Sequence, residues 1–293
     1  MAHTRAELLV NGRSRKSRGA FNEIIAACQA HGITFDHQHL IKPKHLDQTI
    51  EEIKERAPDL LVVGSGDGTI SNVVGHLANS HIELGIIPLG TTNNFARSLE
   101  LPLEIDDAAK VIATGQPRNV DLGHIDDEYF ANVAGVGLSA VIAGSVSDNN
   151  KRRFGRLAYT LEGVWQLFRS TPFILSVEDK DSNLKFNIET HQAIIANGRY
   201  HAGRQIAVDA SLTSQELIIF ALGGRSKLSF LLATVDFYVG KRKSIRHQSY
   251  MIGKNVRLTT SSPQSIELDG EVKCTTPCHA SVRPAAIRIR TIT

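Results

Sequence analysis

The stretch "LLVVGSGDGTISNVV" (residues 60–74) predicts a strand, a glycine-rich loop and a helix in direct succession. Residues 60–63 are all apolar, which is typical of a strand that is buried on both faces of a parallel sheet. Apolar residues then recur at helical spacing, and this indicates a helix that opens near Thr69. Asp67 lies at the centre of the intervening loop, among Gly64, Gly66 and Gly68. An acid among glycines at a strand end requires a chemical explanation.

Strand and helix signals alternate over the first 120 residues of the chain. The expected strands are 7–11, 33–39, 60–63 and 84–89, and the expected helices cover 21–32, about 46–53 and about 70–77. Repeated β-α-β units indicate a doubly wound parallel sheet with helices on both faces.

Short strand candidates dominate after residue 118. They lie within 118–125, 128–135, 173–179, 184–191, 192–198, 216–224, 255–260 and 265–272. Only two helix candidates interrupt them, at about 154–170 and 226–239. Many short strands separated by turn signals favour an antiparallel β-sandwich. The predicted fold class is therefore an α/β domain followed by a β-rich domain.

The composition excludes several classes of protein. The chain has 293 residues, 42% of them hydrophobic, and a net charge of +3, which does not require a nucleic-acid partner. No apolar run reaches about 18 residues, and the apolar run near the N-terminus is too short for a signal peptide, so we expect a cytoplasmic protein. Three cysteines argue against a disulfide framework. Cys274, Cys278 and His279 leave two alternatives open, a zinc site or two reduced thiols beside a turn.

The glycine loop has the features of a phosphate site. Ligands of open parallel sheets bind beyond the carboxyl ends of the strands, and glycines let backbone N–H groups approach a phosphate. The helix that follows directs its positive end to the same place. Asp67 would repel a bare phosphate, and a Mg²⁺ ion between the two removes this conflict. A structural turn is the alternative; the glycine spacing matches neither a P-loop nor the Rossmann fingerprint.

Two further strand ends carry polar residues of suitable chemistry. After the strand at 84–89, Gly90 is followed by Thr91, Thr92, Asn93 and Asn94, which suit phosphates and a sugar. Their alternative role is an ordinary helix cap. After the strand at 7–11, Asn11 is followed by cations that could clamp phosphates or form a solvated loop, namely Arg13, Arg15, Lys16 and Arg18.

Three segments together carry a family resemblance. Residues 65–69 match a G-G-D-G-T signature, residues 88–97 match P-x-G-T-x-N-D-F-A-R, and residues 268–271 match L-D-G-E. With the segment 120–140 between them, the chain resembles the diacylglycerol-kinase catalytic-domain family of lipid kinases over nearly its whole length. The first signature alone is shared with NAD kinases and phosphofructokinase-like folds.

The resemblance implies a nucleotide-binding α/β domain over 1–120, a β-sandwich lipid domain over 121–280 and a C-terminal strand, 281–293, that returns to the first domain. It implies transfer of the γ-phosphate of ATP to a lipid hydroxyl with Mg²⁺. Asp269 is then the general base, Glu271 holds metal or phosphate, and Asp67 organises Mg–ATP, directly or through water. The implied nucleotide contacts are Asn11, Gly66, Asp67, Gly68, Thr69, Thr91 and Asn93, with Arg15, Lys16 and Arg18 as a phosphate clamp.

Some positions depart from the family pattern. Asn94 stands where many members have an aspartate, Gly12 replaces a proline, and His39-Leu40 occupy the place of a nucleotide-contacting threonine. Ser214-Gln215 replace an Asp-Gly pair that binds a structural Mg²⁺ in relatives, so we do not carry this second metal over. A catalytically silent lipid- or nucleotide-binding homologue and a kinase for a soluble acceptor therefore remain as alternatives.

A lipid acceptor also implies peripheral contact with the inner face of a membrane. The helix candidates at 154–168 and about 226–239 are apolar and lie beside the basic runs at 151–153 and 241–243. The alternative is that both helices only cover the sandwich core. The sequence does not distinguish a monomer from a homodimer, nor one lipid acceptor from another.

Overall fold

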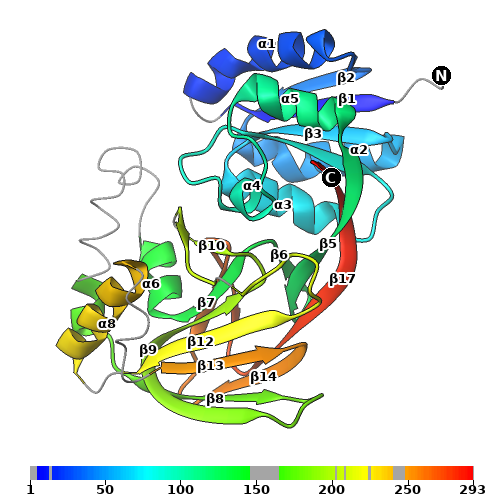
Figure 1. Ribbon diagram of the computed structural model, residues 1–293. Coiled ribbons are helices and arrows are strands. Elements are labelled where there is room, and N and C mark those ends of the chain that lie inside the picture. The colour runs from blue at the N-terminus through cyan, green and yellow to red at the C-terminus, as the bar shows by residue number, and fades with distance from the viewer. Residues whose placement is uncertain are drawn as a thin grey trace. The chain divides into compact units, whose positions relative to one another are not determined.

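The computed structural model describes residues 5–12, 15–145, 165–201, 203–207, 209–223, 226–239 and 248–292 (Figure 1). Contacts within the chain divide it into two compact units. The first unit comprises Met1–Leu122, Tyr200–Gly203 and Arg283–Thr293, and the second comprises Gly123–Arg199 and Arg204–Val282. Each unit is therefore assembled from segments that are distant in the sequence.

The first unit contains a parallel sheet in the strand order β2-β1-β3-β4. Its strands are β1 (Ala6–Asn11), β2 (His37–Ile41), β3 (Leu60–Ser65) and β4 (Glu83–Pro88). The last residues of β17 (Cys278–Thr291) pair in parallel with β4, with Arg288 opposite Glu83. Arg288 and Arg290 each donate to the Glu83 carboxylate at 2.6 Å. The strand β2 begins at His37, later than the predicted residue 33.

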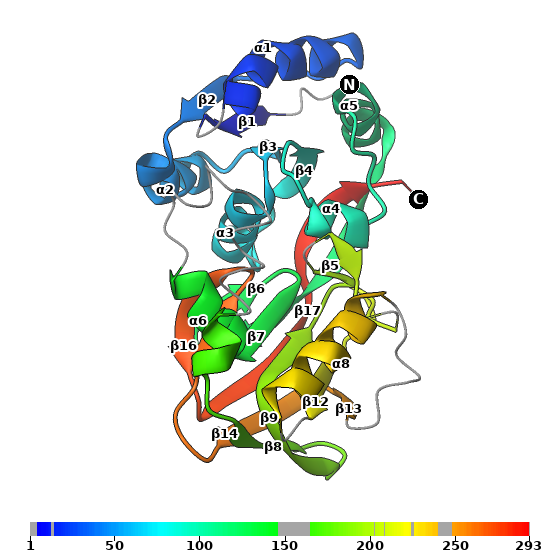
Figure 2. The same ribbon diagram turned by 90° about the vertical axis from the view of Figure 1, so that its left-hand side faces the viewer.

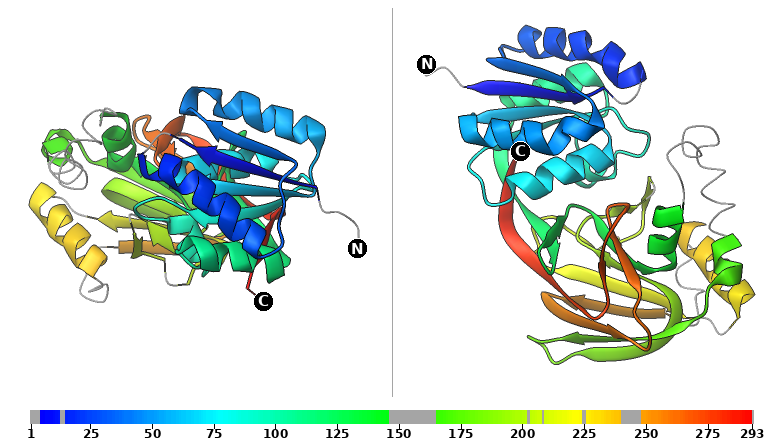
Figure 3. Two further views of the ribbon diagram at one scale, coloured as in Figure 1. Left: turned by 90° about the horizontal axis from the view of Figure 1, so that it is seen from above. Right: turned by 180° about the vertical axis from the view of Figure 1, so that it is seen from behind.

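Helices cover both faces of this sheet, as the sequence predicts (Figure 3). On one face, α1 (Arg15–Ala30) and α5 (Ile105–Thr114) bury Ile24, Cys28 and Ile112 against alternate residues of β1. On the other face lie α2 (Leu46–Arg56), preceded by the 3₁₀ turn η1 (Pro43–His45), and α3 (Asp67–Leu77). The short α4 (Asn94–Ser98) follows β4. The predicted α/β domain is confirmed.

A buried ion pair fixes α2 to the sheet of the first unit. Glu7 on β1 is 2% exposed, and its carboxylate accepts hydrogen bonds from Nε and Nη2 of Arg56, both at 2.7 Å. His39 on β2 contacts the same carboxylate at 3.0 Å. Burial raises the pKa of Glu7, but the hydrogen bonds from Arg56 and His39 outweigh burial, and the net effect lowers this pKa. His39 therefore belongs to a structural network.

The second unit is a mainly antiparallel sheet system in the order β16-β15-β7-β9-β8-β14-β17, and β12 and β13 extend it from β9. Apolar side chains that point to one face of these strands, among them Ile195, Leu258 and Ile266, form the main core of the unit. The predicted β-sandwich is confirmed. The strands of this unit are the end of β5 (Gln116–Ile125), β6 (Glu128–Phe130), β7 (Val133–Gly137), β8 (Phe173–Asp179), β9 (Lys185–Ala196), β12 (Leu217–Gly223), β13 (Gln248–Gly253), β14 (Asn255–Thr260), β15 (Ser265–Leu268) and β16 (Glu271–Thr275). A separate two-stranded sheet consists of β10 (Tyr200–His201) and β11 (Arg204–Gln205).

Helices cover a second apolar layer of this unit (Figure 2). Leu138 of α6 (Leu138–Ser145), Leu167 of the helical residues 165–169 and Phe230 of α8 (Lys227–Val239) pack in one buried cluster. The sequence did not predict α6, and residues 154–164 of the predicted helix 154–170 lie outside the described residues. Within the described part of the chain, no helix is long and apolar enough to cross a membrane.

Candidate active site

Asp67 connects two loops at the carboxyl ends of neighbouring strands. Its Oδ2 accepts the Thr92 hydroxyl at 2.7 Å, and its Oδ1 accepts the backbone N–H of Phe95 at 3.3 Å. The sequence indicated that α3 opens near Thr69, and in the structure α3 begins at Asp67. The carbonyl of Gly66 accepts the Ile70 N–H at 3.1 Å and so starts the helix two residues earlier. Asp67 therefore lies in the positive first turn of α3.

The glycines of the first loop serve different purposes. A Cβ on Gly66 would lie 3.2 Å from the Cα of Gly90, and a Cβ on Gly90 would lie 2.9 Å from the Cα of Gly66. The backbones of the two loops therefore touch, which only glycines allow. Gly64 instead lies under α1, where a Cβ would meet Ile24 at 2.7 Å. Gly68 is exposed, and a Cβ there would have no atom within 4 Å, so the space beside this residue is open.

Asn11 and Thr69 bring a third strand end into the same site. Asn11, the last residue of β1, is buried, and its Nδ2 donates to the Thr69 hydroxyl at 2.8 Å. The sequence analysis assigned both residues to one nucleotide site, and the structure brings them into contact within the first unit. Arg15, Lys16 and Arg18 were expected on a loop, but their backbone belongs to α1. Their side chains lie outside the described residues.

The second loop is folded by its own amide side chains. Asn93 adopts a left-handed conformation (φ 48°), and its side chain accepts the Gly90 N–H at 2.8 Å and donates to the Gly90 carbonyl at 3.1 Å. Asn94 accepts the N–H of Gly203 at 2.8 Å, and an aspartate in this position could accept the same bond. Thr91 is exposed at the loop surface. Asn93 stands at the N-cap position of α4, but its side chain makes no capping hydrogen bond and instead shapes the loop.

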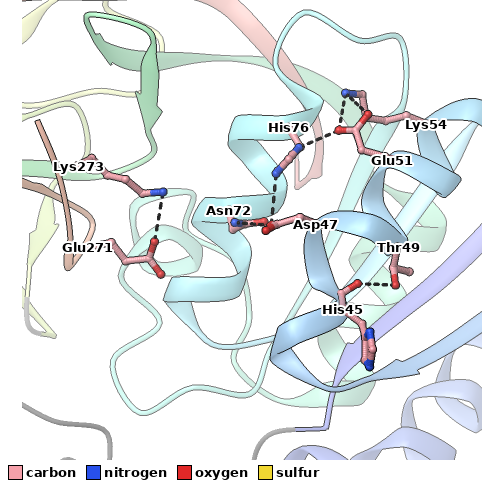
Figure 4. Close-up of polar contacts among 9 residues, drawn as sticks. All are labelled: His45, Asp47, Thr49, Glu51, Lys54, Asn72, His76, Glu271 and Lys273. Carbon is pink, nitrogen blue, oxygen red and sulfur yellow. Dashed lines mark hydrogen bonds and ion pairs between the residues drawn. The ribbon is translucent and has the colours of Figure 1, made fainter.

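Polar contacts hold α3 against α2 (Figure 4). His76 lies between two acids of α2, 2.9 Å from Glu51 and 3.5 Å from Asp47. Asn72 donates to the same Asp47 carboxylate at 3.1 Å. These contacts fix the helix whose first turn carries Asp67.

In the second unit, Asp269 and Gly270 form the two-residue turn between β15 and β16. Both residues have positive φ angles, 48° and 98°, as a type I′ turn requires. The Asp269 carboxylate accepts the N–H groups of residues 131, 132 and 133 at 2.7, 3.0 and 3.0 Å. The Asp269 N–H donates to the carbonyl of Val133 at 2.9 Å. The hairpin turn thus fixes this carboxylate in one orientation.

Two further acids flank this turn. Glu271 is exposed at the start of β16, and its carboxylate lies 3.7 Å from Nζ of Lys273 (Figure 4). Glu267 on β15 is 2% exposed, and its Oε2 accepts the Gly270 N–H at 2.6 Å. Burial, reinforced by the charge of Asp269, raises the pKa of Glu267 to about 8, while the Gly270 hydrogen bond acts in the opposite direction. Glu267 was not among the predicted site residues, because no helix was expected to pack on β15.

The cysteines near this hairpin are protonated thiols. Burial raises the pKa of Cys278 to about 12 and that of Cys274 to about 11. Across the residues with assigned positions, no cluster of three or more His, Cys, Asp or Glu side chains could hold a metal ion. Cys278 begins β17 directly after the turn that ends β16.

Comparison with known proteins agrees with this architecture. The diacylglycerol kinase catalytic domain family matches residues 5–125, and the YegS C-terminal NAD kinase beta sandwich-like domain family matches residues 132–291. The diacylglycerol kinase of Bacillus subtilis (strain 168) is 30% identical over 224 residues, which cover 75% of this chain and 74% of the relative. A crystal structure described as a diacylglycerol kinase from Bacillus anthracis str. Sterne superposes on this chain with a TM-score of 0.79 at 22% identity. The superposition covers 99% of this chain and 98% of the Bacillus anthracis chain. The structural likeness extends over both units.

Proposed function

Because this chain belongs to the diacylglycerol kinase catalytic-domain family, we propose that it is an ATP-dependent kinase that phosphorylates the hydroxyl of a diacylglycerol-like lipid. The observation that carries the proposal is the contact between three strand-end loops of the first unit. Asn11 ends β1, Asp67 follows β3 and Thr92 follows β4, and these are three neighbouring strands. Open backbone at Gly68 and the first turn of α3 suit a phosphate chain.

The carboxylate of Asp67 fits a nucleotide-bound Mg²⁺. Because Thr92 and Phe95 already donate to Asp67, water between the carboxylate and the metal fits this site better than a bare contact. The ion, when bound with ATP, supplies neutralisation of phosphate charge. The protein's own part is to hold the triphosphate in a single orientation, through the N–H groups at the start of α3.

Asp269 is our candidate for the general base. Three backbone N–H groups keep its carboxylate in place, so the acceptor hydroxyl would meet an oriented oxygen. Phosphoryl transfer proceeds mainly through positioning and charge neutralisation, and an oriented acceptor matches this requirement. Glu271 on the same hairpin would assist with metal or phosphate, and its pairing with Lys273 has to open for this role.

The test is transfer of labelled phosphate from [γ-³²P]ATP to a panel of purified lipids. We expect a labelled diacylglycerol-like product from the wild-type protein and a loss of at least a hundredfold in kcat for Asp269→Asn and Asp67→Asn. A circular dichroism melt of each variant controls for folding. If folded Asp269→Asn keeps wild-type kcat, the base assignment is wrong. If wild-type protein binds ATP but labels no lipid, the silent homologue is the correct interpretation, whereas labelling of NAD would identify a soluble acceptor.

We further propose that the helices of the second unit contact an anionic membrane surface. Trp165 and Phe168 on the helical residues 165–169, and Leu228, Leu232 and Val235 on α8, are 51–61% exposed. These side chains lie on the helix faces opposite Leu167 and Phe230, which are buried in the core. The described ionisable side chains of these helices are basic. Cζ of Arg169 lies 4.3 Å from the centre of the Trp165 ring, and Nζ of Lys227 donates a hydrogen bond to the carbonyl oxygen of Phe168. Exposed apolar side chains beside cations suit anionic lipid headgroups.

Co-sedimentation with lipid vesicles tests this contact. We expect binding to phosphatidylglycerol vesicles, weaker binding to phosphatidylcholine vesicles, and at least a fivefold loss of binding for Leu232→Glu. Leu184→Glu is the matched control, because Leu184 is equally exposed at 55% but lies between β8 and β9. Equal loss in both variants, or no loss in either, would contradict the assignment of this surface.

A further inference from the structure

The inner side of the Asp269 turn contains a second carboxyl group. Glu267 alternates with Ile266 and Leu268 on β15, so it points away from the core that these two residues join. Its Oε2 accepts the Gly270 N–H at 2.6 Å, across the turn. Glu267 therefore holds Gly270 of the turn from the buried side, while the N–H groups of residues 131–133 hold the Asp269 carboxylate.

The space for Glu267 is provided by a glycine on the adjacent strand. Gly135 of β7 lies opposite Glu267 in the sheet register. A Cβ on Gly135 would lie 2.4 Å from Oε1 of Glu267 and 2.1 Å from the hydroxyl oxygen of Ser139 on α6. Any side chain at this position would therefore displace the Glu267 carboxyl. The carboxyl occupies a fitted space beneath the turn, and this space is closed to solvent.

Glu267 can occupy this space because it is uncharged at neutral pH. Burial raises its pKa to about 8, and the nearby charge of Asp269 acts in the same direction. The elements β7 and α6 that pack against it carry no ionisable side chain, and on β16 Glu271 pairs with Lys273. A neutral carboxyl accepts the Gly270 N–H without placing a second negative charge beside Asp269.

We propose that Glu267 is a positioning residue for the proposed kinase reaction: its carboxyl fixes the Gly270 N–H and thereby the orientation of the Asp269 carboxylate. The inference rests on the role proposed above for Asp269. Glu267 itself touches no substrate in this scheme and acts only through the turn.

Two substitutions separate this role from simple stability. Glu267→Gln keeps an acceptor of the same size, so we expect kcat within threefold of wild type. Glu267→Met removes the acceptor, and we expect a fall of at least tenfold in kcat with the KM for ATP within twofold of wild type. Val272→Ala is the matched control, since Val272 lies on the same hairpin but is 45% exposed. A similar kcat for the Gln and Met variants would overturn the proposal.

Amide hydrogen exchange provides a readout that does not depend on activity. In Glu267→Met we expect exchange at least tenfold faster at Gly270 and at residues 131–133, and no change in the Gln variant. Unchanged exchange in a folded Met variant would overturn the proposal even if kcat falls. Failure of the proposed function gives a different result, because a fully active Asp269→Asn protein would remove the catalytic assignment while leaving these exchange rates as predicted.

The pH profile gives a third result. Ionisation of Glu267 would place a negative charge beside Asp269, so we expect wild-type kcat to fall as the pH rises through about 8. The Gln variant cannot ionise and should keep its kcat over this range. An identical decline in both proteins would overturn the positioning role.

Discussion

Replacing Gly68 by alanine should make the protein more stable and a weaker binder of ATP. Gly68 lies in the first turn of α3, and an added Cβ would meet no atom within 4 Å. Its φ angle is not in the left-handed region, so alanine fits the backbone without strain. Alanine in place of an exposed helical glycine contributes about 0.5–1 kcal/mol to the free energy of unfolding. For a unit of this size we expect the melting temperature to rise by about 1–4 °C.

In the proposed nucleotide site, the same methyl group would stand beside the Gly68 N–H that we expect to bind a phosphate. A hydrogen bond from a backbone N–H to a charged group contributes about 1.5–3 kcal/mol, and its loss weakens binding by roughly ten- to hundredfold. Isothermal titration with Mg–ATP measures the dissociation constant, and differential scanning calorimetry measures the stability. The expected combination is a higher melting temperature together with weaker ATP binding.

Gly90→Ala is the matched control for this experiment. Its Cβ would lie 2.7 Å from Oδ1 of Asn93 and 2.9 Å from the Cα of Gly66, so the loop has to shift. Overpacking of this kind costs about 1–3 kcal/mol, and both stability and ATP affinity should fall. If Gly68→Ala binds Mg–ATP within twofold of wild type, no phosphate contacts this turn, and the argument for the nucleotide site fails.

Substitutions at two further positions test contacts of the first unit. Arg56→Met leaves the Glu7 carboxylate buried without its bidentate partner and should lower the free energy of unfolding by about 2 kcal/mol, a value reduced because Arg56 is one-third exposed. The pKa of Glu7 is lower in the folded protein than the value of 4.5 expected in the unfolded chain. The destabilisation by Arg56→Met should therefore reach its full size at pH values above 4.5, and it should become smaller as the pH falls through the folded pKa. Denaturant titrations at pH 7 and pH 3 measure this difference. Asn94→Asp should keep the hydrogen-exchange protection of the Gly203 amide while Asn94→Ala loses it, and equal protection in both would show that Asn94 is not the acceptor.

Short-range patterns in the sequence were sufficient for much of the fold. The apolar run of β3 and the helical spacing after it predicted the β-α-β units, because a strand buried on both faces leaves this signature. The Asp-Gly pair at 269–270 is typical of the turn that the structure contains there, since few residue pairs accept two positive φ angles. By contrast, the predicted break at 191–192 was wrong, because β9 continues across it.

Contacts between distant residues could not be predicted in this way. The N–H groups that hold Asp269 come from residues 131–133, more than 130 positions earlier, and no local pattern links the two segments. Glu267 looks like a solvent-facing residue of an alternating strand, yet it is buried, and the α6 helix packs on this strand. That helix was missed because its sequence, Leu138–Ser145, is apolar and small on all sides and lacks a helical period.

The pairing of β17 with β4 has a consequence for biosynthesis. Residues 283–293 belong to the first unit, although the whole second unit separates them from the rest of it in the sequence. The ribosome therefore has to deliver the second unit before the sheet of the first can be completed. Until then the β4 edge, which includes the buried run Leu84–Pro88, lacks the partner that pairs with it in the finished chain. Nascent chains should depend on chaperones during this interval, since open apolar edges promote aggregation.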